Sequence, residues 1–205
     1  MGIPQIHYIT EQEYLDAERL ALNKHEYYKG EVFPLHRYED TKGEIVAMSG
    51  ASKAHNEISA NCIYELKHKL KGKSCRPYGS DMRVNIPENT LYTYPDISVY
   101  CNEAETLDNE KDTAINPIVI FEILSKTTRS YDLGQKFELY RQIETLKEYI
   151  LIDSEQLNVI KYYRNQDQSW LLTEYKSIQD SFEIEALEIE LKLSDIYDNV
   201  KFEIT

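Results

Sequence analysis

Two carboxylates stand inside apolar, β-branched runs of the chain, where apolar residues would be expected. Asp96 lies in the run 94–100 and Glu122 in the run 118–125. Both runs are typical of buried strands, and an ionised carboxylate is costly there unless another charge compensates it. If the two strands are neighbours, the carboxylate pair would suit a divalent cation such as Mg²⁺. Metal-assisted hydrolysis is the chemistry that such a pair supports.

Hydrolysis of a phosphodiester also benefits from a cationic group near the attacking water or the developing charge, and lysine supplies a compact one. Leu124, which shares a strand face with Glu122, cannot do this. Lys136 lies one helical turn after Asp132 in a stretch with helical apolar spacing, so these two side chains share a face. Lys136 is therefore the candidate cation that reaches the carboxylates from outside the strand.

Each of these residues also has a structural explanation. Asp96 could cap a turn at a strand entrance, and Glu122 could form a buried ion pair with a residue such as Arg129. A lysine on a helix, such as Lys136, is usually solvated. Asp132 is a candidate supporting residue of the site, but it could equally be the N-cap of the helix that begins near it.

Three further titratable residues are candidate supporting members of the same site. Asp81 lies beside a predicted strand and could be a second metal ligand. Glu57 lies near the start of a long predicted helix, where a carboxylate also favours the positive end of the helix dipole. His55 lies near the start of that helix too, where capping or packing is the commoner role of a histidine.

Apolar periodicity indicates which elements would carry these residues. The predicted helices cover 10–22, where Thr10 and Glu13 match a capping box, 52–71, where Ser52 could be the cap, and a stretch from about 132. The predicted strands cover 25–33, 44–48, 75–76, 82–86, 96–100, 118–124, 146–153, 157–163, 170–175 and 182–193. This order predicts an α/β core with antiparallel strands added to it.

The composition is ordinary for one globular domain. The chain has 205 residues, of which 41% are hydrophobic and 29% charged, and we expect a single domain over 1–205. It contains no apolar run of about 18 residues for a membrane span, and its first residues lack the features of a signal peptide, which favours the cytoplasm. Cys62, Cys75 and Cys101 are odd in number and widely spaced, so they are expected to be reduced and structural.

The net charge of −13 is unfavourable for a protein that binds nucleic acid, because lysine and arginine supply most of the non-specific affinity for phosphates. The charge is uneven, however. Between 53 and 83, Lys and Arg outnumber Asp and Glu, whereas acids dominate from 180 to 205. The acidic segment is more typical of a solvated rim than of an interaction tail.

An ordered set of short motifs spans nearly the whole chain: Gly50-Ala51-Ser52 with His55, Pro95-Asp96, Glu122-Ile123-Leu124-Ser125, Thr128-Arg129 with Asp132 and Lys136, Tyr140, the run 148–153, and Ile196-Tyr197. Each motif alone is common. Together they resemble the Uma-type restriction endonuclease family, within the PD-(D/E)xK nuclease superfamily.

The resemblance implies a restriction-endonuclease-like α/β (α+β) fold, with a mixed central sheet flanked by helices. It also implies a Mg²⁺ or Mn²⁺ site at Asp96 and Glu122, a catalytic lysine moved from the strand to the helix at Lys136, and cleavage of DNA. Restriction-type cutting of two strands needs two active sites, so a homodimer is expected. The chain departs from the family by an insertion, Pro34–Val46, which could alter a dimer or DNA contact but more simply lengthens two strands.

Two other functions stay open at this point, because a fold does not settle a function. One is a nuclease-fold module that binds DNA or another protein without cleavage. The net charge favours that alternative, and the intact set of Asp96, Glu122 and Lys136 disfavours it. The other is metal-dependent hydrolysis of RNA or of a nucleotide, which could use the same residues.

Overall fold

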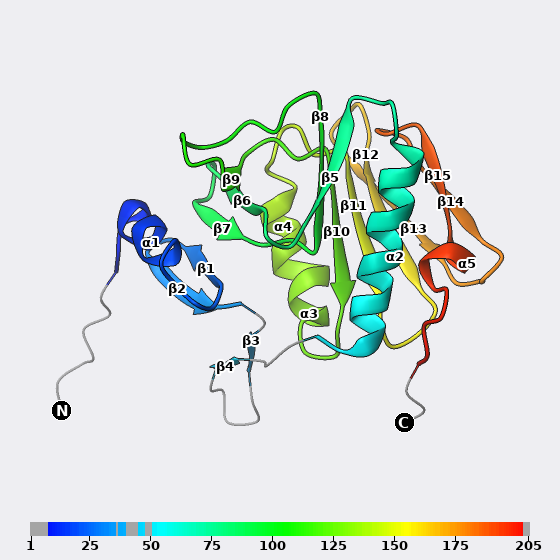
Figure 1. Ribbon diagram of the computed structural model, residues 1–205, viewed down its shortest axis with the longest axis horizontal. Coiled ribbons are helices and arrows are strands. Elements are labelled where there is room, and N and C mark those ends of the chain that lie inside the picture. The colour runs from blue at the N-terminus through cyan, green and yellow to red at the C-terminus, as the bar shows by residue number, and fades with distance from the viewer. Residues whose placement is uncertain (1–7, 36, 40–44, 48–50, 203–205) are drawn as a thin grey trace.

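A six-stranded mixed sheet forms the centre of the computed structural model, which describes residues 8–35, 37–39, 45–47 and 51–202 (Figure 1). Its strands lie in the order β13-β12-β11-β10-β8-β5. They are β5 (Cys75–Gly79), β8 (Ile97–Cys101), β10 (Val119–Leu124), β11 (Glu148–Asp153), β12 (Val159–Arg164) and β13 (Trp170–Tyr175). β10 and β11 run parallel, and the other neighbours are antiparallel. The predicted mixed central sheet is confirmed.

Helices pack against both faces of this sheet, because its central strands are apolar on both sides. The elements are α2 (Lys53–Lys69) on one face, and α3 (Arg129–Tyr131), the π-helical turn η1 (Asp132–Lys136) and α4 (Phe137–Tyr140) on the other. Successive residues of β10 alternate between the two layers. Phe121 packs in the α2 layer with Ile58, whereas Ile120 packs in the α4 layer with Tyr140.

A smaller five-stranded sheet lies beside the main one, in the order β2-β1-β7-β6-β9. Its strands are β1 (His25–Tyr28), β2 (Glu31–Pro34), β6 (Arg83–Ile86), β7 (Leu91–Thr93) and β9 (Thr113–Ala114), and α1 (Glu11–Glu18) packs on it. Thr10 and Glu13 form the predicted capping box. The prediction of one strand over 25–33 is wrong, because Lys29 and Gly30 adopt φ of 49° and 89° and turn the chain into a hairpin.

Two hairpins complete the fold. β14 (Ser181–Ile184) and β15 (Ile189–Lys192) pair and lead into α5 (Leu193–Ile196), so the prediction of one strand over 182–193 is wrong. β3 (Arg37–Glu39) and β4 (Ile45–Ala47) form a separate two-stranded sheet within the insertion, whose positions 36 and 40–44 lie outside the described residues. The described helices include none that is both long and apolar enough to cross a bilayer.

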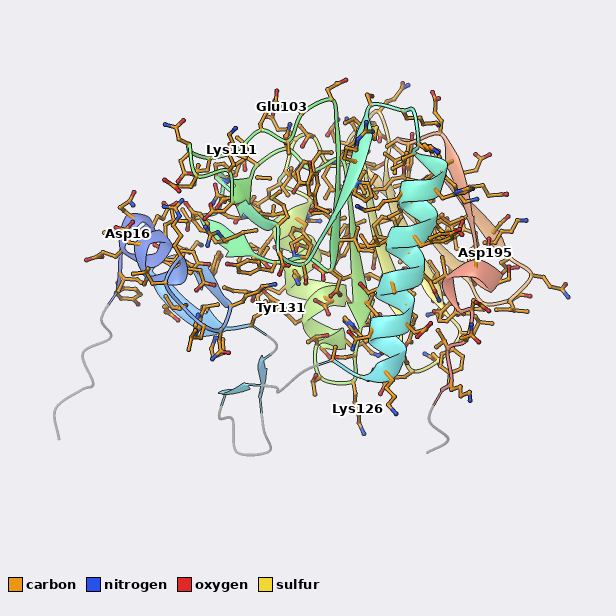
Figure 2. All side chains as sticks on the ribbon, in the orientation of Figure 1. Asp16, Glu103, Lys111, Lys126, Tyr131 and Asp195 are labelled. Atoms are coloured by element: carbon orange, nitrogen blue, oxygen red, sulfur yellow. A yellow bond between two sulfur atoms is a disulfide. The ribbon has the colours of Figure 1, made fainter. Side chains whose placement is uncertain are left out.

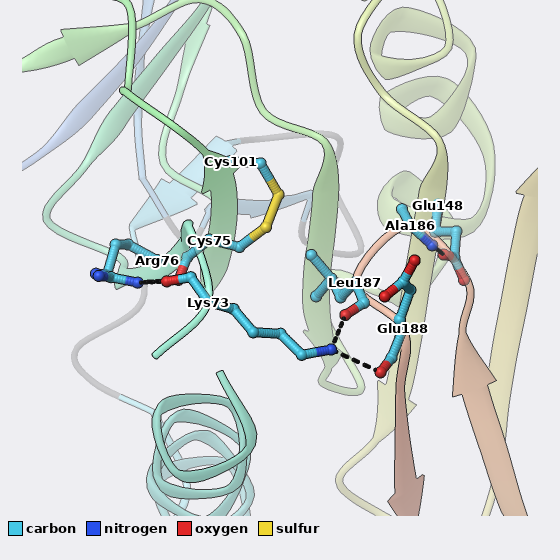
Figure 3. The surroundings of a disulfide bond; sticks show 8 residues. All are labelled: Lys73, Cys75, Arg76, Cys101, Glu148, Ala186, Leu187 and Glu188. Carbon is cyan, nitrogen blue, oxygen red and sulfur yellow. Dashed lines mark hydrogen bonds between the residues drawn. A yellow bond between two sulfur atoms is a disulfide. The ribbon is translucent and has the colours of Figure 1, made fainter. Parts of the chain in front are cut away.

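Cys75 and Cys101 form a disulfide bond, so the expectation that all the cysteines are reduced is wrong for this pair. The two residues face each other across the antiparallel strands β5 and β8, a proximity that their separation of 26 positions hides in the sequence. Cys62 is free and buried, as expected. Figure 3 shows the bond near Lys73, whose ammonium donates hydrogen bonds to two carbonyls in the β14–β15 turn.

A buried charge cluster joins the same hairpin to the main sheet. Glu148, at the start of β11, is fully buried, and Lys161 of β12 lies with Nζ 3.4 Å from its Oε2 and 2.6 Å from Oε2 of Glu185. Burial raises the pKa of Glu148 to about 8, and a hydrogen bond with Glu185 adds to this although Lys161 opposes it. Burial also acts to raise the pKa of Glu185, but its hydrogen bonds with Lys161 and Glu148 together outweigh burial, and this pKa is lowered instead. Glu148 is therefore the member of the pair that keeps a proton.

We expect the free energy of unfolding to fall as the pH rises from about 5 to about 8, by up to about 1.4 kcal/mol per pH unit from Glu148. The sign follows because the folded state keeps a proton on Glu148, whereas the unfolded chain releases that proton near the ordinary glutamate pKa of 4.5. In Glu148→Gln the slope should be shallower and the stability at pH 8 higher. Urea unfolding across this range measures both, with exposed Glu174→Gln as the control. Identical slopes in Glu148→Gln and the wild type would contradict the assignment.

Candidate active site

Asp96 and Glu122 lie side by side, where β8 begins next to the middle of β10. The two strands are antiparallel with Ile97 opposite Phe121, which brings Asp96 next to Glu122. The backbone N–H of Ile123 donates to Asp96 Oδ2 at 2.7 Å, and that of Asp96 donates to Glu122 Oε2 at 3.4 Å. The two side chains are only 13% and 4% exposed. The pair is therefore largely withdrawn from solvent.

Lys136 reaches Glu122 from the helical layer that faces it. Its Nζ lies 2.8 Å from Glu122 Oε1 and 3.5 Å from Asp132 Oδ1. The hydroxyl of Tyr140 donates to the same Glu122 Oε1 at 2.8 Å. The helical stretch begins at Arg129, so the alternative that Asp132 is its N-cap is wrong. Asp132 is instead buried in η1, like Lys136.

These groups hold one another in unusual protonation states. Burial raises the pKa of Glu122 to about 8; Asp132 and Asp96 add to the rise, and Lys136 opposes it. Burial disfavours the Lys136 ammonium, but the carboxylates around it outweigh burial and hold its pKa well above the ordinary value. Burial also disfavours the Asp96 carboxylate, but the hydrogen bond with His55 helps to lower its pKa. The ammonium of Lys136 thus partly compensates several buried carboxylates, and the carboxylates outnumber the cations around them.

The cluster lines a cavity of about 890 Å³. Lys126 and Tyr131 also line it, and Figure 2 shows both at the end of the main sheet where α2 begins. Ser52 caps α2 as predicted, accepting a hydrogen bond from the backbone N–H of His55. His55 Nε2 lies 3.4 Å from Asp96 Oδ1. The first turn of α2 therefore sets His55 against the carboxylate pair.

The wall of the cavity is completed by residues 199–202 near the end of the chain. Asn61 of α2 anchors this segment, because its side-chain amide donates to the carbonyls of Ile196 at 3.0 Å and Asp198 at 2.9 Å. The cavity thus depends on a helix and a tail that are far apart in the sequence.

Of the predicted supporting residues, Glu57 lies at the cavity and Asp81 lies outside it. Glu57 lines the cavity but its side chain is exposed. Asp81 lies in a smaller surface pocket, with its side chain 97% exposed and Oδ1 2.6 Å from Lys24 Nζ. The structure therefore does not bring Asp81 to the carboxylate pair, and the ligand role considered for it is not retained.

Glu26 is a buried carboxylate of the same cavity that sequence reasoning missed. It lies in β1 of the smaller sheet and is only 4% exposed. The hydroxyl of Thr93 donates to its Oε1, and the hydroxyl of Tyr131 donates to its Oε2 at 3.5 Å. Its charge adds to those that hold up the pKa of Lys136. The signal in the sequence was the same as for Glu122, a carboxylate inside a strand-forming run.

The donor set fits a hard divalent cation such as Mg²⁺. Within the part of the chain that the structure describes, Asp96 Oδ1 and Glu122 Oε2 have only long contacts, 3.4 Å in each case, so these two oxygens are the least engaged by neighbouring groups. Among the described residues, no three or more His, Cys, Asp or Glu side chains are grouped as a complete metal site. Mg²⁺ does not require one, because one or two carboxylates commonly hold it together with water and substrate phosphates.

A solved structure shares this fold. The crystal structure of a "putative nuclease belonging to DUF820" from Anabaena variabilis matches with a TM-score of 0.68, covering 92% of this chain and 97% of that one. The two sequences are 17% identical, so the likeness shows the fold alone. The restriction-endonuclease-like architecture expected from the sequence is confirmed.

Sequence comparison shows the family. The Uma2 model, described as "Putative restriction endonuclease", matches residues 12–195, and the chain belongs to this family. Two uncharacterized proteins of Synechocystis, slr1290 and sll1609, are 31% identical over 156 residues and 37% identical over 129 residues. These matches cover 76% and 63% of this chain and 80% and 73% of the relatives. The resemblance found in the sequence is confirmed, and it supports a nuclease-like function.

Proposed function

We propose that the protein is a Mg²⁺- or Mn²⁺-dependent endonuclease that hydrolyses phosphodiester bonds in DNA. The observation that carries the proposal is the buried cluster in which Asp96 and Glu122, from adjacent strands, share one cavity with Lys136 from the facing helix. A pair of carboxylates with a fixed cation beside them is suited to a reaction in which negative charge develops on a phosphate. Membership of the Uma2 family supports the same reaction class.

Each residue of the cluster has a distinct task in this proposal. Asp96 and Glu122 would hold the metal through the two oxygens that have only long contacts. Mg²⁺ bound there would supply Lewis-acid stabilisation of a phosphate oxygen and a lower pKa for a water. Lys136 keeps its proton because its pKa is raised, so it acts as a fixed positive charge or as a donor that orients the attacking water, and not as a base. Tyr140 and His55 hold the two carboxylates in place.

Cleavage of supercoiled plasmid by the purified protein, with Mg²⁺ or Mn²⁺, tests the proposal. The wild type should convert the plasmid to nicked or linear forms, and Asp96→Asn should lose this activity because a metal-holding oxygen is replaced by an amide. Asp81→Asn is the matched control, since it removes an exposed carboxylate of the separate pocket and should cut like the wild type. Equal cutting by all three proteins would place the activity elsewhere. A metal-binding protein that cuts nothing would favour the non-cleaving module.

We infer that the active form is a homodimer, because cutting both strands of a duplex at one place calls for two active sites. Mass measurement in solution, by light scattering on a sizing column, should give twice the chain mass of 24.1 kDa. A monomer that makes double-strand breaks would contradict this inference.

A further inference from the structure

The exposed side of α2 carries a row of aromatic and cationic side chains, here called the α2 stripe. Its members are Lys53, Tyr64, Lys67, His68 and Lys71, and all five are exposed. An α-helix has 3.6 residues per turn, so Tyr64 lies about three turns after Lys53 and at nearly the same angle. Lys71, just past the end of α2, lies about two turns further on. The five side chains therefore share one side of the helix.

Tyr64 is the unusual member of the stripe. Its exposed fraction is 65%, whereas Tyr14, Tyr100 and Tyr149 are almost completely buried. The ring stacks on His68, with 6.0 Å between the ring centroids and 10° between the planes. An exposed ring held flat by a neighbour on one side is suited to stacking against a further flat ring.

The lysines of the stripe are not neutralised by the protein. Within the described residues, Lys53, Lys67 and Lys71 have no ion-pair or hydrogen-bond partner for their ammonium groups. Nearby Lys69, in contrast, lies with Nζ 3.5 Å from Glu65 Oε2, and Lys73 donates to two carbonyls. The protein as a whole has a net charge of −13, so this row of free ammonium groups is a locally positive surface on an acidic protein. Glu57 is the acid of α2 that lies on the same side.

The stripe begins at the candidate active site. Lys53 lines the cavity, together with His55. From there α2 leads away along the main sheet (Figure 1). Its 17 residues span about 25 Å at 1.5 Å per residue, the length of roughly seven nucleotides at a stacked spacing of about 3.4 Å. A strand that leaves the cavity over Lys53 would meet Tyr64 and the remaining lysines.

We propose that the α2 stripe binds single-stranded DNA that continues from the strand held in the cavity. Tyr64 stacks on a base, and Lys53, Lys67 and Lys71 contact phosphates. A base can stack on Tyr64 only when it is not already paired and stacked in a duplex. The inference rests on the proposed nuclease function and deepens it, because it assigns the enzyme a substrate with an unpaired stretch beside the cleaved bond.

Fluorescence anisotropy with labelled oligo(dT) of about 20 residues tests the stripe. Binding is measured with EDTA in an Asp96→Asn background, which prevents cleavage. Tyr64→Ala should weaken binding about tenfold, whereas Tyr64→Phe, which keeps the ring, should bind within about twofold of the parent. The double variant Lys67→Ala/Lys71→Ala should reduce the slope of log K against log salt by about 1.4. Lys111→Ala/Lys147→Ala is the matched control, since both lysines are exposed and lie outside the stripe.

The contrary outcomes are distinct. Unchanged binding in Tyr64→Ala and in Lys67→Ala/Lys71→Ala, or no binding of oligo(dT) at all, would overturn the stripe. Tighter binding of a duplex of the same length, or of oligo(U), would overturn single-stranded DNA as its ligand. If the protein cleaves plasmid but binds oligo(dT) equally well without the stripe residues, the proposed role of the α2 stripe is wrong and the proposed nuclease function still holds. If binding of oligo(dT) depends on the stripe residues but the protein cuts no DNA, the proposed nuclease function is wrong and the binding role of the α2 stripe still holds.

Discussion

Replacing Glu122 by Gln is expected to slow plasmid cleavage by at least about 10³-fold at saturating Mg²⁺, because the metal loses one of its two carboxylates. Gln keeps the shape of the side chain and can still accept the hydrogen bond from Tyr140. Burial disfavours the ionised form of Glu122, as its raised pKa of about 8 indicates. Replacing it by a neutral side chain should therefore leave the free energy of unfolding near pH 8 at least as large as in the wild type. Loss of activity would then report on the metal site and not on the fold.

Glu148→Gln is the matched control for this experiment. Glu148 is also a buried strand glutamate with a pKa raised to about 8, but it lies in the cluster with Lys161, away from the cavity. Its replacement should leave cleavage unchanged. Calorimetric titration of Mg²⁺ into the three proteins gives a second readout, in which Glu122→Gln alone should bind weakly. Full activity or unchanged metal binding in Glu122→Gln would contradict the assigned site.

Replacing Lys136 by Met is expected to lower the free energy of unfolding by about 3–5 kcal/mol at pH 8, because it leaves buried carboxylates without their cation. Lys136 lies within 4 Å of Glu122 and Asp132, and Glu26 adds to the field around it. Without the ammonium, the carboxyl groups take up protons in the folded state that the unfolded chain releases. Stability should therefore fall with rising pH, and much of the loss should be recovered near pH 5.

Urea unfolding at pH 5 and pH 8 measures this effect. Lys176→Met is the control, because Lys176 forms an exposed ion pair with Glu174 and should not change the stability. Adding Glu122→Gln to Lys136→Met should restore part of the loss at pH 8, since one uncompensated charge is removed. Equal stability of Lys136→Met and wild type at pH 8 would show that Lys136 does not compensate these carboxylates. The single variant should also be inactive, whatever its stability.

The sequence predicted the two central strands and their carboxylates because the local signal was strong. Asp96 and Glu122 interrupt runs that are otherwise apolar, and such runs have few alternatives to a buried strand. Lys136 could be chosen for a similar reason, since its spacing from Asp132 fixes their common face on any helix. The π-helical geometry of η1 was not predictable, because it depends on how the helical stretch settles against the sheet.

The missed features are those that only the tertiary fold brings together. Glu26 belongs to the smaller sheet, and nothing local to β1 shows that this sheet borders the cavity. Cys75 and Cys101 are separated by 26 positions and become neighbours only through the register of β5 and β8. The hairpin at Lys29-Gly30 was missed although the sequence carries a local signal for it. Gly30 is a residue type that favours turns, but the strand-forming residues on both sides of it favoured one continuous strand.

Residues 199–202 form one wall of the cavity, and Asn61 anchors this segment through the carbonyls of Ile196 and Asp198. The cavity can therefore close only after this segment has been synthesised. The cavity draws on residues from Glu26 to Phe202, and contacts over such separations are slow to form because loop closure costs entropy before the contacts repay it. On the ribosome, the central strands and α2 can collapse long before the tail emerges. An unfinished chain therefore carries the buried charges of the cluster without the closed cavity around them.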